Sequence, residues 1–296
     1  MEYISKNKIC REKWKFYFVL LAWPLYLFLM PMAYKYIGYF SVIIMIFPGA
    51  YLFTWLGFLM HECWHKYVPE INNKVFYKVF SWFLLNDPQT YNLIHGIHHS
   101  KVNSWEDIEF HPLGKIKNTL LRRLYNLMEI IFGIAFVSFV VNSILPYHKD
   151  FKNKYSRRSQ VLSIIMYIII YGGLVLACHY AFNIGYSTIV ILYIVNLWIV
   201  SFVLHHSQLI EHGNLVLEGN YKERNVKTRN LSNDGILEKI FLFLTHGDSR
   251  EHVLHHTLPG VYSRPFPRKV PMPAESMYIN LKDYMKILWV MLSEKI

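Results

Sequence analysis

The sequence predicts an all-α integral membrane protein, a single domain over residues 1–296, with four transmembrane helices in two hairpins. Two observations on composition predict this class. The chain is 53% hydrophobic and 17% charged, whereas a soluble domain is nearer one quarter charged. Its uncharged runs reach the roughly 20 residues that a helix needs to cross a bilayer. A third observation, three short histidine clusters, predicts a cytoplasmic histidine-rich metal-binding cap. Interfacial helices are expected beside the spans.

Residues 16–34 and 39–60 form the first predicted hairpin. The first run contains Pro24 and Pro31, which membrane helices tolerate. It is too long for the core of a signal peptide, and no small-residue cleavage site follows it. We therefore expect a retained span, preceded by a basic cytoplasmic lead-in. The second run ends directly at the first histidine cluster, and residues 75–85 suit an interfacial or buried helix.

Three apolar runs follow, over residues 127–145, 161–182 and 187–204. If all three crossed the membrane, the second and third histidine clusters would lie on opposite faces and share no site. The loop 146–160 holds five basic residues against one Asp, which indicates a cytoplasmic loop. We therefore predict that 161–182 and 187–204 cross, whereas 127–145 is interfacial or re-entrant. Both termini and all histidine clusters are then cytoplasmic, and the tail 277–292 is expected as an amphipathic helix on the membrane.

The formal net charge of +11 is explained by this topology, because Lys and Arg are retained on the cytoplasmic side. Nucleic-acid binding is not expected, since the sequence shows no soluble basic module with stacking aromatics. Cys10, Cys63 and Cys178 are scattered and fit neither a metal finger, an iron–sulfur motif nor a disulfide framework.

The three histidine clusters have spacings that place their side chains together. They are His61-Glu62-Cys63-Trp64-His65, His95-Gly96-Ile97-His98-His99 and His252-Val253-Leu254-His255-His256. Residues three and four apart share a helix face, so each cluster can aim two or three imidazoles at one point. Eight imidazoles suffice for two metal ions. Nitrogen ligands favour Fe, Zn, Cu or Ni over Mg and Ca, without choosing among the former.

The first cluster also fits the H-E-x-x-H motif of zinc proteases, in which Glu62 would be the general base. A membrane zinc metalloprotease through His61 and His65 is therefore the alternative from another class. It needs only one further ligand and leaves the other two clusters unexplained.

Taken in order, the clusters resemble the histidine boxes of the membrane fatty acid desaturase and hydroxylase superfamily, over about residues 55–273. Glu211-His212-Gly213, followed by Arg229-Asn230, is similar to the stretch before the third box. The third cluster continues as Thr257-Leu258-Pro259-Gly260-Val261, close to the H-H-x-x-P-x-[VI] pattern of that box.

The resemblance implies a diiron site whose ligands are all histidines. They are His61, His65, His95, His98, His99, His212, His252, His255 and His256. Glu62, Asp107 and Glu211 would orient imidazoles by accepting their other N–H. His205 and His206 lie just upstream of His212, and the sequence leaves open whether one of them replaces or joins it.

The resemblance also implies an O2-dependent oxidoreductase with two iron ions, acting on unactivated C–H bonds of a lipid-like chain. Fatty acyl desaturation is the first expectation. Hydroxylation, oxidative decarboxylation, carotenoid oxygenation and a non-catalytic lipid-binding role stay open. Electrons are expected from a separate donor, a ferredoxin or a cytochrome with its reductase.

Overall fold

The computed structural model describes residues 14–66, 68, 71–148, 151, 154–258 and 271–293. The predicted lead-in before Trp14 and the Pro259-Gly260-Val261 end of the third motif lie outside these residues. The contacts divide the described chain into two compact units. We call residues 14–89 and 156–201 the span unit, and residues 90–155 and 202–293 the histidine unit. That the two act as one domain stays a prediction.

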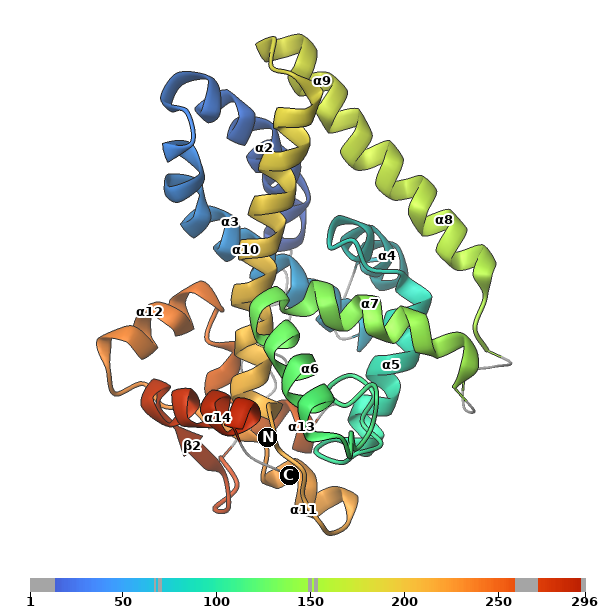
Figure 1. Ribbon diagram of the computed structural model, residues 1–296, viewed down its shortest axis with the longest axis vertical. Helices are drawn as coiled ribbons and strands as arrows, with labels where there is room; N and C mark the ends of the chain where they lie inside the picture. The colour runs from blue at the N-terminus through green and yellow to red at the C-terminus, as the bar shows by residue number, and fades with distance from the viewer. Residues whose placement is uncertain are drawn as a thin grey trace. The chain divides into compact units, whose positions relative to one another are not determined.

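Four helices are long and apolar enough to cross a membrane, in agreement with the predicted number (Figure 1). They are α2 (Trp14–Ile37), α3 (Phe40–Trp64), the continuous helix Arg157–Phe182 and α10 (Tyr186–His212). The third consists of α8 (Arg157–Tyr167), the π-helical turn η2 (Ile168–Gly172) and α9 (Gly173–Phe182). The last helix continues well beyond residue 204, because the polar stretch before Gly213 contains no helix-breaking Gly or Pro.

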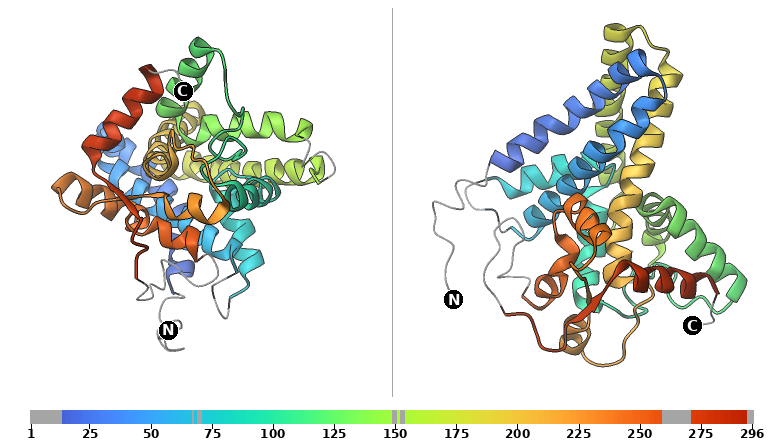
Figure 2. Two further views of the ribbon diagram at one scale, coloured as in Figure 1. Left: turned by 90° about the horizontal axis from the view of Figure 1, so that it is seen from below. Right: turned by 90° about the vertical axis from the view of Figure 1, so that its left-hand side faces the viewer.

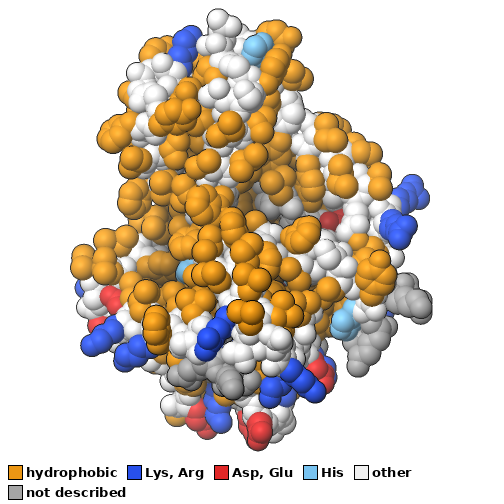
Figure 3. Space-filling model, in the orientation of Figure 1, with side chains coloured by type: hydrophobic (Ala, Val, Ile, Leu, Met, Phe, Trp, Pro, Cys, Tyr) orange, Lys and Arg blue, Asp and Glu red, His pale blue; other side chains and the backbone are white. Residues whose placement is uncertain are grey.

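The span unit is built on packing between its apolar helices. α2 contacts α3 and α9, and α3 contacts the amphipathic helix α4 (Asn73–Phe83). Trp23 and Leu27 of α2 are fully buried, and the Tyr26 hydroxyl donates to Asn196 Oδ1 of α10 at 2.6 Å. The opposite helix faces expose large apolar side chains such as Leu21, which is 72% exposed (Figure 3). Such a surface suits contact with lipid.

The apolar run 127–145 does not form one helix. α6 (Thr119–Phe132) and α7 (Ile134–Ile144) are separated at Gly133, whose φ of 57° and ψ of −140° are open essentially to glycine alone. Each piece is too short to span a bilayer. The run is thus absent from the four candidate spans, while its interfacial or re-entrant placement stays a prediction.

The histidine unit surrounds the second half of α10 with short elements. The ones not yet named are α5 (Pro88–Lys101, in this unit from Thr90), η1 (Leu145–Tyr147), α11 (Tyr221–Val226), α12 (Ile236–Leu244), η3 (Asp248–Arg250), α13 (His252–Thr257) and α14 (Leu281–Ser293). The strands β1 (Arg229–Leu231) and β2 (Met277–Ile279) pair in parallel, with Asn230 opposite Tyr278. A core of Leu209, Leu231, Leu242 and Leu288 joins these elements, and α6 packs beside α14 (Figure 2).

Candidate metal centre

Three helical segments of the histidine unit carry the imidazoles. α5 begins with Pro88, a favourable first helical residue, and bears the second cluster in its last turns. α10 ends at His212, since the next residue is a glycine that no larger residue could replace without strain. A Cβ on Gly213 would lie 2.5 Å from the Leu209 carbonyl oxygen. The third cluster forms the short helix α13.

Strand β1 holds two of these segments in place. Asn230 Oδ1 accepts a hydrogen bond from the Val253 backbone N–H at 3.1 Å, at the start of α13. Its neighbour Arg229 donates from Nη2 to the Gly213 carbonyl at the end of α10. Burial lowers the pKa of Arg229 to about 10, so its side chain stays cationic at neutral pH. Two consecutive residues thus fix the ends of two helices that carry the clustered imidazoles.

The first imidazole group meets through its Nε2 atoms. His212 and His252 are 2.8 Å apart at Nε2, His252 and His256 are 3.0 Å apart, and His212 and His256 are 3.3 Å apart. The nearest ligand atoms of His98, His212 and His256 also lie within 4.8 Å of one another. A neutral imidazole nitrogen either donates or accepts, so three that face one another cannot all be satisfied by hydrogen bonds. Nitrogens bound to one metal at 2.0–2.1 Å are about 3 Å apart, so this donor set fits a cation.

A second group lies beside the first in the same unit. His99 Nε2 is 3.1 Å from His95 Nε2 and 3.3 Å from His255 Nε2. The rings of His99 and His256 have centroids 5.3 Å apart, so the two groups adjoin. The histidine unit therefore presents two neighbouring nitrogen sets, which suits two metal ions.

In three of these histidines, the other ring nitrogen lies beside an oxygen acceptor. His98 Nδ1 lies 2.8 Å from Asp107 Oδ2, His95 Nδ1 lies 3.0 Å from Glu109 Oε2, and His212 Nδ1 lies 3.0 Å from Asn103 Oδ1. An acceptor at Nδ1 fixes the tautomer and leaves the Nε2 lone pair for the metal. This is the arrangement that metal-binding histidines usually have.

The acid–base properties of the group follow from burial and from these carboxylates. Burial lowers the pKa of His98, but Asp107 and Glu109 outweigh it and raise the pKa to about 9. Burial raises the pKa of Glu109 to about 7, against the opposing effect of His98. Burial and then the neighbouring His98 hold the pKa of His252 well below its usual value. Burial and then the neighbouring His252 and His98 hold the pKa of His256 well below its usual value too. Metal binding at neutral pH would therefore displace a proton from His98 but not from His252 or His256.

The three carboxylates predicted to orient imidazoles, Glu62, Asp107 and Glu211, contact different ring nitrogens. Asp107 contacts Nδ1 of an imidazole, as an orienting group would. Glu211 instead lies 3.2 Å from Nε2 of His252, the nitrogen that faces the other imidazoles, and groups with His212 and His252 as a possible ligand. Glu62 is buried in the span unit, 3.8 Å from His61 Nδ1.

The first cluster lies at the end of α3, in the span unit. His61 and His65 approach to 3.2 Å at Nε2, so this pair also aims two nitrogens at one point. The i, i+4 spacing on a helix accounts for this approach.

Sequence reasoning assigned no role to Asn103 and Glu109, although both contact site imidazoles. Their signal was the run of polar residues after the second cluster in an otherwise apolar chain. Asn103 is held by its own amide, which donates to Thr228 Oγ1 at 3.0 Å and to the Arg224 carbonyl at 2.9 Å. Its φ of 54° is a left-handed conformation that Asn adopts more readily than most residues.

His205 and His206 do not join the imidazole groups. The Nε2 of His205 lies 3.3 Å from Glu129 Oε1, and its Nδ1 lies 3.3 Å from Gln208 Oε1. The Nδ1 of His206 lies 2.5 Å from the Tyr284 hydroxyl, and its Nε2 lies 3.0 Å from the Ile130 carbonyl. Each of these two histidines has both ring nitrogens engaged elsewhere, which leaves His212 as the α10 histidine in the cluster.

The comparisons with known proteins agree with this chemistry. Searches of curated proteins and of solved structures gave no match. A family model described as fatty acid desaturase matches residues 37–272, a range that holds all three histidine clusters and His212. The match covers most of the chain, which therefore belongs to the fatty acid desaturase family.

Proposed function

We propose that this protein is a diiron fatty acyl desaturase, which uses O2 to oxidise an unactivated C–H bond of a lipid-like chain. Family membership makes it a membrane oxidoreductase of the desaturase and hydroxylase type. Beyond family membership, we propose that the metal is iron, that two ions are bound and that the reaction is a desaturation. When bound, the iron pair would supply the oxidation of the C–H bond by O2, and the chain would position the iron and the substrate.

The observation that carries the proposal is the pair of adjoining imidazole groups in the histidine unit. His98, His212, His252 and His256 would hold one ion, with Glu211 beside them. The other group, His95, His99 and His255, would hold part of the coordination of a second ion. We add His61 and His65 as ligands because of their place in the family motif and the 3.2 Å approach of their Nε2 atoms.

The burial of these residues supports a role in oxidation. His98 is 3% exposed, His212 is 2% exposed and His256 is 1% exposed. A site closed to bulk water favours reaction with an apolar chain and limits side reactions. Asp107, Glu109 and Asn103 would keep the imidazoles oriented throughout turnover.

The first test is the metal content of the detergent-purified protein, measured by mass spectrometry on wild type and on His98→Ala. We expect about two irons per chain in wild type and loss of much of the iron in the variant. His148→Ala, outside the clusters, should keep the wild-type content. One zinc per chain, retained in His98→Ala and lost in His61→Ala, would contradict the proposal and restore the zinc protease alternative.

The second test concerns the outcome of the oxidation. The iron-loaded protein, reconstituted with lipid, a reductase and a donor protein, should convert acyl chains to products two hydrogen atoms lighter. Mass spectrometry separates these from hydroxylated products, which are one oxygen atom heavier, and from chains shortened by decarboxylation. A predominance of either of the latter would replace desaturation by the corresponding alternative.

A separate electron donor belongs to the proposal. The net charge of +11 suits an acidic ferredoxin or cytochrome, whose encounter with a basic surface is screened by salt. Turnover with an acidic donor should fall steeply as sodium chloride rises from low to physiological concentration. A flat salt dependence would count against this kind of partner.

The proposed topology puts both termini and the metal centre on the cytoplasmic side, with the four spans in two hairpins. Residues 183–185, between α9 and α10, would then face outward, and Lys154 would face the cytoplasm. Single cysteines at Asn183 and Lys154, in a background without Cys10, Cys63 and Cys178, should react with an impermeant thiol reagent in opposite orientations of sealed vesicles.

A further inference from the structure

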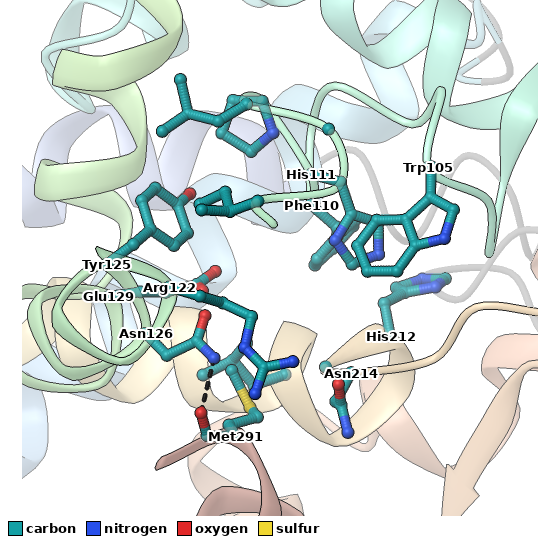
Figure 4. Close-up of a pocket in the computed structure, with 16 residues that line it drawn as sticks. Trp105, Phe110, His111, Arg122, Tyr125, Asn126, Glu129, His212, Asn214 and Met291 are labelled. Carbon is teal, nitrogen blue, oxygen red and sulfur yellow. Dashed lines mark hydrogen bonds between the residues drawn. The ribbon is translucent and has the colours of Figure 1, made fainter. Parts of the chain in front are cut away.

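One cavity of the histidine unit adjoins the metal centre without belonging to it. Its walls come from α6, the loop after α5, the end of α10 and α14, and His212 is one of its lining residues (Figure 4). Its volume of about 40 Å³ is room for roughly three water-sized groups. A small polar group at the end of a larger ligand would fit this space.

The helix α6 turns a polar face toward this cavity. Arg122, Tyr125, Asn126 and Glu129 are buried on it. The other face carries exposed leucines, of which Leu120 is 78% exposed. This is the reverse of an ordinary surface helix, and it suits a helix with lipid on one side and a polar site on the other.

Arg122 is the cation of the cavity, whose lining also includes the Glu129 carboxylate. The side chain is 6% exposed, and within the described residues neither Nε nor Nη2 has a hydrogen-bond partner. In Figure 4 the guanidinium reaches from α6 toward Asn214. Buried donors without acceptors are costly, so a ligand that supplies acceptor oxygens to this guanidinium would be bound favourably.

The geometry of the unpartnered atoms indicates the kind of anion. Nε and Nη2 share one edge of the planar guanidinium, and this edge donates two parallel hydrogen bonds to the two oxygens of a carboxylate. The hydroxyl of Tyr125, one turn further along α6, is a second buried donor that lacks a partner within the described residues.

The rest of the wall favours a single negative charge on an apolar stem. Phe110, Leu209 and Met291 are apolar, and Arg122 is the one Lys or Arg side chain among the lining residues. Glu129 also lines the cavity, with Oε1 3.3 Å from His205 Nε2. A doubly charged phosphate would meet one cation and one carboxylate here, which is a poor match.

We propose that this cavity binds the carboxylate of an aliphatic acid, through Nε and Nη2 of Arg122. The ligand is either a small soluble carboxylate or the free carboxyl end of a lipid chain. Binding of a lipid carboxyl end rests on the proposed function, because the bound free fatty acid would then be the substrate that is oxidised at the metal centre. Binding itself requires neither iron nor turnover.

The experiment measures thermal unfolding of the full chain in detergent as sodium hexanoate is titrated, with sodium chloride keeping the ionic strength constant. Hexan-1-ol is the uncharged analogue and sodium acetate is the short acid. We expect hexanoate to raise the unfolding midpoint and hexan-1-ol to leave it unchanged. Arg122→Met should weaken the apparent affinity for hexanoate by at least about tenfold, since it removes charge-assisted hydrogen bonds.

Arg123→Met is the matched control, because Arg123 is the neighbouring, exposed arginine of α6. It should bind hexanoate like wild type. Arg122→Lys keeps the charge but loses the two-pronged edge, so it should bind with intermediate affinity, and it serves if Arg122→Met fails to fold. Tighter binding of hexanoate than of acetate would identify a chain-bearing acid, and equal binding would identify a small soluble one.

Equal midpoint shifts with hexanoate and hexan-1-ol, no shift with either acid, or an unchanged shift in both Arg122 variants would overturn the carboxylate site. These outcomes are independent of iron content. Failure of the carboxylate site is therefore distinguishable from failure of the diiron proposal.

Discussion

Two sets of histidines on the same helix, α10, have opposite surroundings. His205 and His206 lie one to two turns before His212, and all three are nine-tenths or more buried. His206 is held between the Tyr284 hydroxyl and the Ile130 carbonyl, and His205 between Glu129 and Gln208. His212 has an acceptor, Asn103 Oδ1, at Nδ1 alone. Its Nε2 meets the imidazoles of His252 and His256.

This difference teaches that burial and residue type alone do not make a histidine available to a metal. The surroundings of the second ring nitrogen decide whether a lone pair is left for one. A neutral imidazole with a donor on one side and a carbonyl on the other, as in His206, is fully hydrogen-bonded and has no lone pair left for a metal. The comparison can be tested by changing one member of each set.

The largest difference should appear between His212→Ala and His206→Ala. The first removes a nitrogen from the centre of the first imidazole group, and we expect loss of about one of the two irons. The second leaves both metal sets intact but strands the Tyr284 hydroxyl and the Ile130 carbonyl, at about 1–3 kcal/mol for each buried group. Iron content and thermal unfolding, measured on both variants, separate the two effects. Equal iron loss in both variants would show that His206 also contributes to metal binding.

The next effect concerns the carboxylate behind a ligand. Asp107→Asn keeps the size of the side chain but weakens the acceptor at His98 Nδ1, now 2.8 Å away. Loss of such an orienting group typically costs about 10- to 100-fold in metal affinity. Competition with a chelator measures the change. The control is Glu106→Gln, one residue earlier, where the exposed carboxylate pairs with Lys101 and should leave metal affinity unchanged.

The sequence was sufficient for the four long apolar helices and for the histidine clusters that come together, because both depend on local patterns. The bilayer requires long apolar runs, and helix geometry requires spacings of three and four. It was not sufficient for Asn103, whose contact with His212 joins residues 109 positions apart. Nor did the sequence show that Glu211 approaches Nε2 of an imidazole whereas Asp107 approaches Nδ1. The position of Glu211 depends on how α10 and α13 pack together, which a local pattern does not reveal. The predicted span ended at residue 204, whereas α10 continues to His212. Hydropathy falls over these last residues although the helix does not end.

An effect of comparable size is expected from pH. Asp107 and Glu109, against the effect of burial, raise the pKa of His98 to about 9 in the metal-free protein, so His98 is protonated at pH 7. A metal ion must displace this proton. Apparent metal affinity should therefore rise with pH from 7 to about 9, by at most about tenfold per unit, and then level off. Asp107→Asn should flatten this rise, whereas an equally steep rise in the variant would assign the proton to another group.

The smallest effect on the metal should come from Tyr284→Phe. This change removes the hydroxyl that donates to His206 Nδ1 and leaves the ring and its core packing in place. His206 Nδ1 then becomes a buried acceptor without a donor, and we expect a loss of about 1–3 kcal/mol in stability. Iron content should stay at the wild-type level, because His206 turns Nδ1 toward α14 and Nε2 toward α6 and not toward the other imidazoles. Tyr278→Phe, at a 52% exposed position of β2, is the control and should change neither quantity. Gain or loss of iron in Tyr284→Phe would show that His206 is coupled to the metal centre, against the separation of the two sets on α10.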